Sequence, residues 1–226
     1  MSKTLQFSIQ NEGKLIKIEP VEHVEVLGIF IDQDLSWKKQ IKRIKRNAMG
    51  KIRNLHRINF MLPRQQRINL YNALVSPQFD YGDILWGGAN QKELNSLQRI
   101  QNFAMKSILG KKRKYSNRKA MKELKFLNLE QRRKIHRTVF LHKALLNISS
   151  QNLHNQISNY LPKFNTRNKS KNNLTIPTHN TAKFERSPLY KMILDWNSTP
   201  DTLPKENVKL HKIHFQKYLI NQLLTE

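Results

Sequence analysis

Apolar residues recur at helical spacing over most of this chain. From Trp37 to Ile58 they stand three and four residues apart, which places them on one face of a helix. This set is Ile41, Ile44, Ala48, Ile52 and Leu55. From Lys92 to Leu109 the pattern returns, with Leu94, Leu97, Ile100, Gln101, Ala104 and Ile108 facing inward. We therefore predict two long amphipathic helices that form part of a helical bundle.

Shorter helices are predicted between and after these two. Pro63 suits the first turn of a helix that runs to Val75, and Pro77 begins another short one. Further helices are expected near Arg118 to Leu124, from Leu129 to about Leu146, from Leu189 to Trp196, and from Val208 to Leu224. The last of these has Leu210, Ile213, Phe215, Tyr218, Leu219 and Leu223 available for burial.

The first part of the chain has a different pattern. Lys14 to Ile18 alternates between polar and apolar residues, and Val24 to Ile31 is apolar and rich in β-branched residues, as in strands. Turn residues follow from Asp32, and Ser36 suits the N-cap of the helix that begins at Trp37. The expected fold class is mainly α: a small N-terminal β element, a helical bundle, and a C-terminal helical segment after a long loop.

These elements divide the chain into four predicted parts. Residues 1–36 form the β element, 37–146 the bundle, 147–186 a flexible linker, and 187–226 the C-terminal helices. The linker is predicted because its sequence is rich in Asn, Ser, Lys and Thr and has few periodic apolar residues.

The net charge of the sequence indicates that the helical domain binds a polyanion. Forty-one Lys and Arg stand against sixteen Asp and Glu, a formal net charge of +25. Such a field attracts nucleic acid through its phosphates. The alternative is a helical protein-interaction module whose basic charge is merely compositional. The chain has no cysteine, and no apolar leader or membrane span is visible in it. We expect an intracellular protein, located in the nucleus, with no membrane partner.

The positive charge gathers in two places. The helix from Trp37 carries nine cations and no acidic residue: Lys38, Lys39, Lys42, Arg43, Lys45, Arg46, Lys51, Arg53 and Arg57. A merely solvated helix would show both signs, so this one is predicted to contact phosphates without reading bases. The second cluster is Lys111, Lys112, Arg113 and Lys114. It could clamp nucleic acid, serve as a nuclear localisation signal, or be a solvated loop.

The sequence gives little support for metal binding or for base stacking by tryptophan. The pairs Asp32 with Asp34 and Asp80 with Asp83 flank turns, where carboxylates usually form caps and turns. His211 and His214 are expected on a polar helix face, because no third metal ligand stands near them in the sequence. Trp37, Trp86 and Trp196 are expected as core anchors, with base stacking the lesser alternative. We predict no catalytic residue, no metal site and no cofactor in this chain.

Several strings, in order, resemble one family. Val24-Glu-Val-Leu-Gly-Ile-Phe-Ile-Asp32 and Leu35-Ser-Trp37 come first. Leu70-Tyr-Asn-Ala-Leu-Val-Ser-Pro77, Asp80-Tyr-Gly82 and Leu85-Trp-Gly87 follow. Leu94-x-x-Leu97-Gln-Arg-x-Gln101-Asn-x-Ala104, Gln131-Arg-Arg133 and Trp196-Asn-Ser198 complete the series. Together they resemble the end of the palm, the thumb and the post-thumb region of non-LTR, jockey-like retrotransposon reverse transcriptases. Val26 departs from the family, which usually has an aromatic residue or Leu there.

The resemblance implies a function. Leu27 and Gly28 would match the primer-grip turn, where glycine lets the backbone approach the primer. The bundle would be a thumb that grips RNA, DNA or an RNA/DNA duplex. The family's aromatic-Ala-Asp-Asp hairpin, whose carboxylates hold two metal ions, does not occur in this sequence. We expect no polymerase activity from the chain alone. A full-length enzyme would need Mg²⁺, and the missing palm and fingers of a longer polyprotein would be partners.

Overall fold

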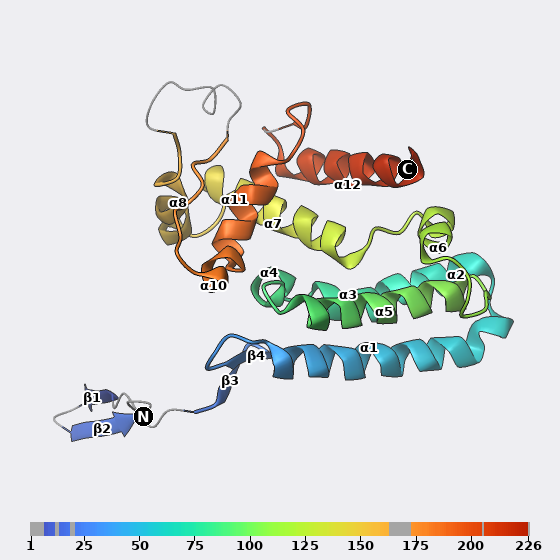
Figure 1. The fold of residues 1–226 in the computed structure, drawn as a ribbon, viewed down its shortest axis with the longest axis horizontal. Coiled ribbons are helices and arrows are strands. Elements are labelled where there is room, and N and C mark those ends of the chain that lie inside the picture. The colour runs from blue at the N-terminus through green and yellow to red at the C-terminus, as the bar shows by residue number, and fades with distance from the viewer. Residues whose placement is uncertain (1–6, 12–13, 19–20, 163–172, 205, 226) are drawn as a thin grey trace.

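The fold is seen in a computed structural model, which describes residues 7–11, 14–18, 21–162, 173–204 and 206–225. It is mainly helical, as predicted (Figure 1). The helices stack in layers: α1 (Lys38–Ile58) lies under α5 (Gln91–Ile108), α7 (Leu129–Leu145) lies on α5, and α12 (Val208–Thr225) covers α7.

The β element consists of two antiparallel hairpins. Strands β1 (Phe7–Asn11) and β2 (Lys14–Ile18) pair with each other and lie to one side of the helical body in Figure 1. Strands β3 (His23–Val26) and β4 (Ile29–Asp32) form the second hairpin, which contacts α1. The predicted stretch from Val24 to Ile31 is therefore two strands, because Leu27 and Gly28 reverse the chain between them.

The turn between β3 and β4 is strained at one residue. Leu27 and Gly28 have φ values of 48° and 76°, and two positive values are what a type I′ turn requires. Glycine adopts this region freely, but a leucine there costs about 1–2 kcal/mol. Leu27 is also 85% exposed, so burial in this chain does not offset that cost.

Helix α1 agrees closely with the prediction. It begins one residue later than expected, and all five residues assigned to its inner face are buried. The N-cap prediction was wrong by one position: Trp37 precedes the helix with a φ of 61° and caps it with no side-chain hydrogen bond. Ser36 Oγ instead accepts a long hydrogen bond from Lys38 N and donates one to Asp32 Oδ2.

Residues 64–80 form one helical run where two separate helices were predicted. It consists of α2 (Arg64–Leu70), a π-helical turn η2 (Tyr71–Val75) and α3 (Ser76–Asp80). Pro77 has no N–H to donate and would disturb a regular α-helix. The wider turn, in which Ser76 N donates to Tyr71 O, directly precedes it and lets the chain remain helical.

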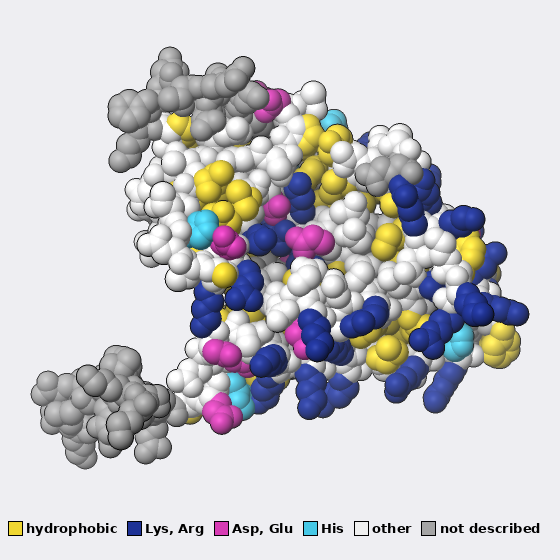
Figure 2. All heavy atoms as spheres, in the orientation of Figure 1, with side chains coloured by type: hydrophobic (Ala, Val, Ile, Leu, Met, Phe, Trp, Pro, Cys, Tyr) yellow, Lys and Arg dark blue, Asp and Glu magenta, His cyan; other side chains and the backbone are white. Residues whose placement is uncertain are grey.

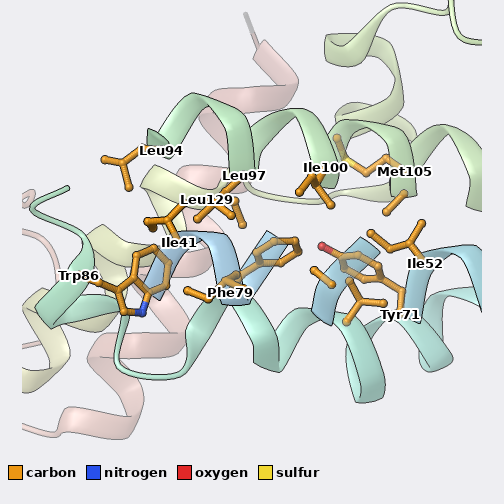
Figure 3. Close-up of a cluster of buried hydrophobic side chains, with 14 of the residues drawn as sticks. Ile41, Ile52, Tyr71, Phe79, Trp86, Leu94, Leu97, Ile100, Met105 and Leu129 are labelled. Carbon is orange, nitrogen blue, oxygen red and sulfur yellow. The ribbon is translucent and has the colours of Figure 1, made fainter. Parts of the chain in front are cut away.

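The main core lies between α1, the run from α2 to α3, and α5 (Figure 3). Ile41 and Ile52 of α1 meet Leu97 and Met105 of α5, with Phe79 alongside. Trp86, on α4 (Asp83–Trp86), closes one end of the core and donates from Nε1 to Tyr81 O at 2.8 Å. Trp37, Trp86 and Trp196 are all buried, which confirms their prediction as core anchors.

Two smaller cores hold the C-terminal half. One joins α7, α8 (Gln151–Ser158) and α11 (Pro188–Asn197), and the other joins α7 to α12. The segment assigned to a linker contains α8 and α10 (Ala182–Glu185), and its Ile157 and Leu174 are buried in the first of these cores. Part of this segment, residues 163–172, lies outside the described residues. The division into four parts stays a prediction.

The inner face of α12 was only half predicted. Phe215, Leu219 and Leu223 are buried, but the exposed fractions of Leu210, Ile213 and Tyr218 are 47%, 39% and 37%. His211, expected on a polar face, is fully buried. Its ring centroid lies 4.8 Å from that of His142 and 5.6 Å from that of Trp196.

Candidate nucleic-acid interface

The exposed cations of α1 form a single stripe. Lys38, Lys42, Arg46, Arg53 and Arg57 are exposed, and they stand four, four, seven and four residues apart. This spacing places them on one face of the helix, opposite the buried isoleucines. At 1.5 Å per residue the stripe is about 30 Å long, which matches about eight steps of 3.4 Å along a nucleic-acid strand. We call these five residues the α1 stripe.

The other four cations of α1 are partly buried, and some have partners within the chain. Arg43 Nη1 lies 2.5 Å from Glu25 Oε1, and Lys45 Nζ lies 2.8 Å from Glu93 Oε2. Lys39 contacts the ring nitrogen of His23. The repulsion along α1 that the sequence indicates is therefore relieved in part by carboxylates from other elements.

A groove of about 1260 Å³ runs beside the stripe. Its lining includes Lys38, Lys42, Arg46 and Arg53, together with Phe30, which lies beneath Lys39 and Arg43. Their cationic groups are 4.5 and 5.1 Å from the centroid of the Phe30 ring. Figure 2 shows dark blue side chains in a row along the lower edge of the molecule, where α1 lies.

Acidic residues line only one part of this groove. Asp32 and Asp34 stand in the turn before α1, and Glu22 precedes β3. Asp34 Oδ1 accepts a hydrogen bond from Ser36 N, which lowers the pKa of this carboxyl below its ordinary value. Both aspartates thus hold the turn, as predicted.

The hairpin turn lies close to the stripe. Tyr81 Oη donates a hydrogen bond to Leu27 O at 2.5 Å, and Arg43 Nη1 donates one to Gly28 O at 3.3 Å. A hollow of about 290 Å³ lies beneath the turn, and Arg43 lines both this hollow and the larger groove. The structure therefore brings Leu27 and Gly28 next to the basic helix.

The second basic cluster does not line the hollow beneath the turn of Leu27 and Gly28. Lys111, Lys112, Arg113 and Lys114 are exposed in the loop between α5 and α6 (Asn117–Leu124). Lys111 Nζ lies 5.3 Å from the centroid of the Tyr115 ring, and Lys106 Nζ donates to Arg113 O at 2.7 Å. The loop adjoins the C-terminal end of α1, because the same hollow is lined by His56 and Lys111.

One cluster of possible metal ligands lies elsewhere in the described part of the chain. His136 of α7 joins Asp80 and Asp83, with one ligand atom of each within 4.8 Å of the others. Both oxygens of Asp80 already accept hydrogen bonds from Arg132, at 3.0 and 2.5 Å, and Asp83 Oδ2 lies 2.6 Å from His136 Nδ1. A metal ion would have to displace the guanidinium, so we interpret this cluster as a hydrogen-bonded link between α3, α4 and α7.

Other cations serve the interior instead of the surface. Arg137 is 3% exposed, and its guanidinium contacts Asp195 Oδ2 at 2.5 Å and Glu130 Oε1 at 2.6 Å. Burial raises the pKa of Asp195 above its ordinary value even though Arg137 opposes this effect. This network joins α7 to α11, and Arg133 also belongs to it, because its guanidinium lies 2.8 Å from Glu130.

No helix within the described ranges is long and apolar enough to cross a membrane.

The comparisons with known proteins give one partial match. Over 87 residues the chain is 24% identical to a Drosophila melanogaster protein named "Probable RNA-directed DNA polymerase from transposon X-element". This chain is similar in part to a retrotransposon polymerase. The match covers 37% of the chain and 10% of that polymerase. No family model matches, and no solved structure matches.

Proposed function

We propose that this chain binds nucleic-acid duplexes by their phosphates along α1, as the duplex-gripping, thumb-like part of a retrotransposon RNA-directed DNA polymerase. The observation that carries the proposal is the α1 stripe: five exposed cations on one helix face, on a helix without an acidic residue. Phosphate contacts of this kind position a duplex and carry no sequence information. RNA, DNA and RNA/DNA duplexes are all expected to bind.

The hairpin turn supports a more detailed role. Leu27 is both strained and exposed, and residues held in such conformations cluster at functional sites. We propose that the turn of Leu27 and Gly28 contacts the primer strand beside Arg43, as the family resemblance implies. The palm carboxylates and their Mg²⁺ would then belong to a longer protein, in which the palm and fingers are partners of this chain.

The salt dependence of binding tests this proposal. If each of the five stripe cations neutralises one phosphate, the logarithm of the association constant should fall with the logarithm of salt concentration with a slope of about −4.5, or about −0.9 per contact. Fluorescence anisotropy with a labelled RNA/DNA duplex between low and moderate salt measures the slope. Duplexes of unrelated sequence should give the same value. An affinity independent of salt would reject the proposal and favour a protein-interaction module.

A further inference from the structure

A second surface begins where the α1 stripe ends. Two adjoining hollows, of about 370 and 430 Å³, lie at the C-terminal end of α1, and both are lined by His56, Ser107 and Lys111. One extends along α5 past Phe103, and the other reaches Phe60 in the short turn η1 (Asn59–Met61). We call this surface the end patch. In Figure 2 the corresponding end of the molecule, at the right, shows hydrophobic side chains among dark blue ones.

The end patch presents aromatic rings to solvent. Phe60 is 82% exposed and gains little from burial within this chain, and Phe103 is 41% exposed. Phe103 is nevertheless held in place: its ring centroid lies 6.1 Å from that of His56, and His56 Nδ1 lies 2.8 Å from Ser107 Oγ. Asn59 also donates to Ser107, through Nδ2 to Oγ at 2.7 Å, which fixes the turn that carries Phe60.

The charge around these rings is entirely positive. The two hollows are lined by Arg67, Arg99, Lys106, Lys111, Lys112 and Arg113, and none of their lining residues is acidic. Exposed aromatic rings within a field of cations suit a polyanion that offers flat faces for stacking. A duplex does not offer them along its length, because its bases are stacked on one another, whereas unpaired nucleotides do.

We propose that the end patch binds unpaired nucleotides, with Phe60 and Phe103 as stacking surfaces and the surrounding cations as phosphate contacts. The proposal rests on the proposed function, because the patch begins at His56, next in sequence to Arg57 at the end of the α1 stripe. A nucleic acid whose duplex lies along α1 would reach the patch where its paired region ends. The molecule would thereby recognise a junction between a duplex and a single strand.

Three nucleic acids test this: a blunt duplex, the same duplex with an unpaired overhang, and the same duplex with an abasic overhang. The normal overhang is expected to raise affinity by about tenfold for each base that stacks, and the abasic overhang by much less. In the double variant Phe60→Ala and Phe103→Ala the advantage of the normal overhang over the abasic one should disappear. The affinity for the blunt duplex should stay as in the wild type.

The outcomes separate the two proposals. If the blunt duplex fails to bind the wild type, the proposed function fails. If the blunt duplex binds but the normal and abasic overhangs give equal affinity, or the double variant keeps the difference, the end patch does not stack bases. The variant Phe60→Trp adds a direct signal, since its new indole should be quenched by the overhang substrate and unaffected by the blunt duplex. Thermal unfolding of Phe60→Trp is expected to match that of the wild type, because Phe60 is 82% exposed. The unchanged affinity for the blunt duplex is the control for folding of the double variant.

Discussion

Replacing Lys42, Arg46 and Arg53 together by glutamine is expected to weaken the affinity for a duplex by about 500-fold at about 0.1 M salt. Each of these side chains is exposed on the α1 stripe, and each is proposed to neutralise one phosphate. Losing three contacts should also flatten the salt slope by about 2.7. Arg43 and Lys45 are left unchanged because Glu25 and Glu93 already pair with them.

The matched control removes the same charge from another layer. Lys209, Lys212 and Lys217 are exposed on α12, which packs on α7 and makes no part of the groove beside the stripe. Their replacement by glutamine lowers the net charge equally, so it should reproduce only the general loss of attraction and leave the salt slope nearly unchanged. Equal weakening by the two variants would mean that net charge, and not the α1 stripe, binds the duplex.

Replacing Arg137 by alanine is expected to lower the free energy of unfolding by about 3–5 kcal/mol at neutral pH. The substitution leaves Asp195 buried without its guanidinium partner, and an uncompensated buried charge is strongly destabilising. Chemical denaturation followed by circular dichroism measures the loss. The matched surface variant, Arg43→Ala, removes an ion pair with Glu25 that is far more exposed and should cost only about 0–1 kcal/mol.

The effect of Arg137→Ala should depend on pH with a definite sign. The pKa of Asp195 is already raised by burial, and loss of Arg137 raises it further. A group with a raised folded pKa contributes stability below its unfolded pKa and loses it as the pH rises through the folded value. The difference between wild type and variant should therefore shrink as the solution becomes acidic enough to protonate Asp195. A difference that grows toward acidic pH would contradict this account of the network.

Buried residues were predicted correctly from the sequence where a helix has a single apolar face. Helices α1 and α5 each have a single apolar stripe, and their inner residues were assigned correctly. Helix α12 has apolar residues on several sides, so the spacing of its apolar residues did not indicate which side would be buried. The residues that α12 buries stand four apart, from His211 through Phe215 and Leu219 to Leu223. Phe215 and Leu219 share a core cluster with Ile135 of α7, so packing against α7 selects this face.

The sequence could not separate cations that face solvent from cations that serve the fold. Arg132 and Arg137 also lie in a basic stretch of helix. Arg132 nevertheless binds Asp80, 52 residues earlier in the sequence, and Arg137 binds Asp195, 58 residues later. Long-range partners of this kind leave no local signal. The same holds for Asp80, Asp83 and His136, which meet only because α7 packs on α3 and α4.

The end patch was not predicted from the sequence, although the positions of its two phenylalanines in the sequence indicate that they are exposed. Phe103 is out of phase with the inward residues of α5, and Phe60 follows the end of α1 and precedes Leu62 and Pro63. An aromatic residue out of phase with its helix is expected at the surface. What the sequence could not indicate is that the loop holding Lys111 would lie against the end of α1 and complete the surface.

Binding of a duplex along α1 can be tested directly by a lysine-modification footprint of the protein with and without a saturating RNA/DNA duplex. Amine acetylation followed by mass spectrometry reports each lysine separately, and a phosphate contact should shield the amine that makes it. Duplex binding along α1 should strongly protect Lys42 of the α1 stripe and change the reactivity of Lys209, Lys212 and Lys217 on α12 little. Equal reactivity of Lys42 in the free and bound protein, or protection of the α12 lysines alone, would contradict it.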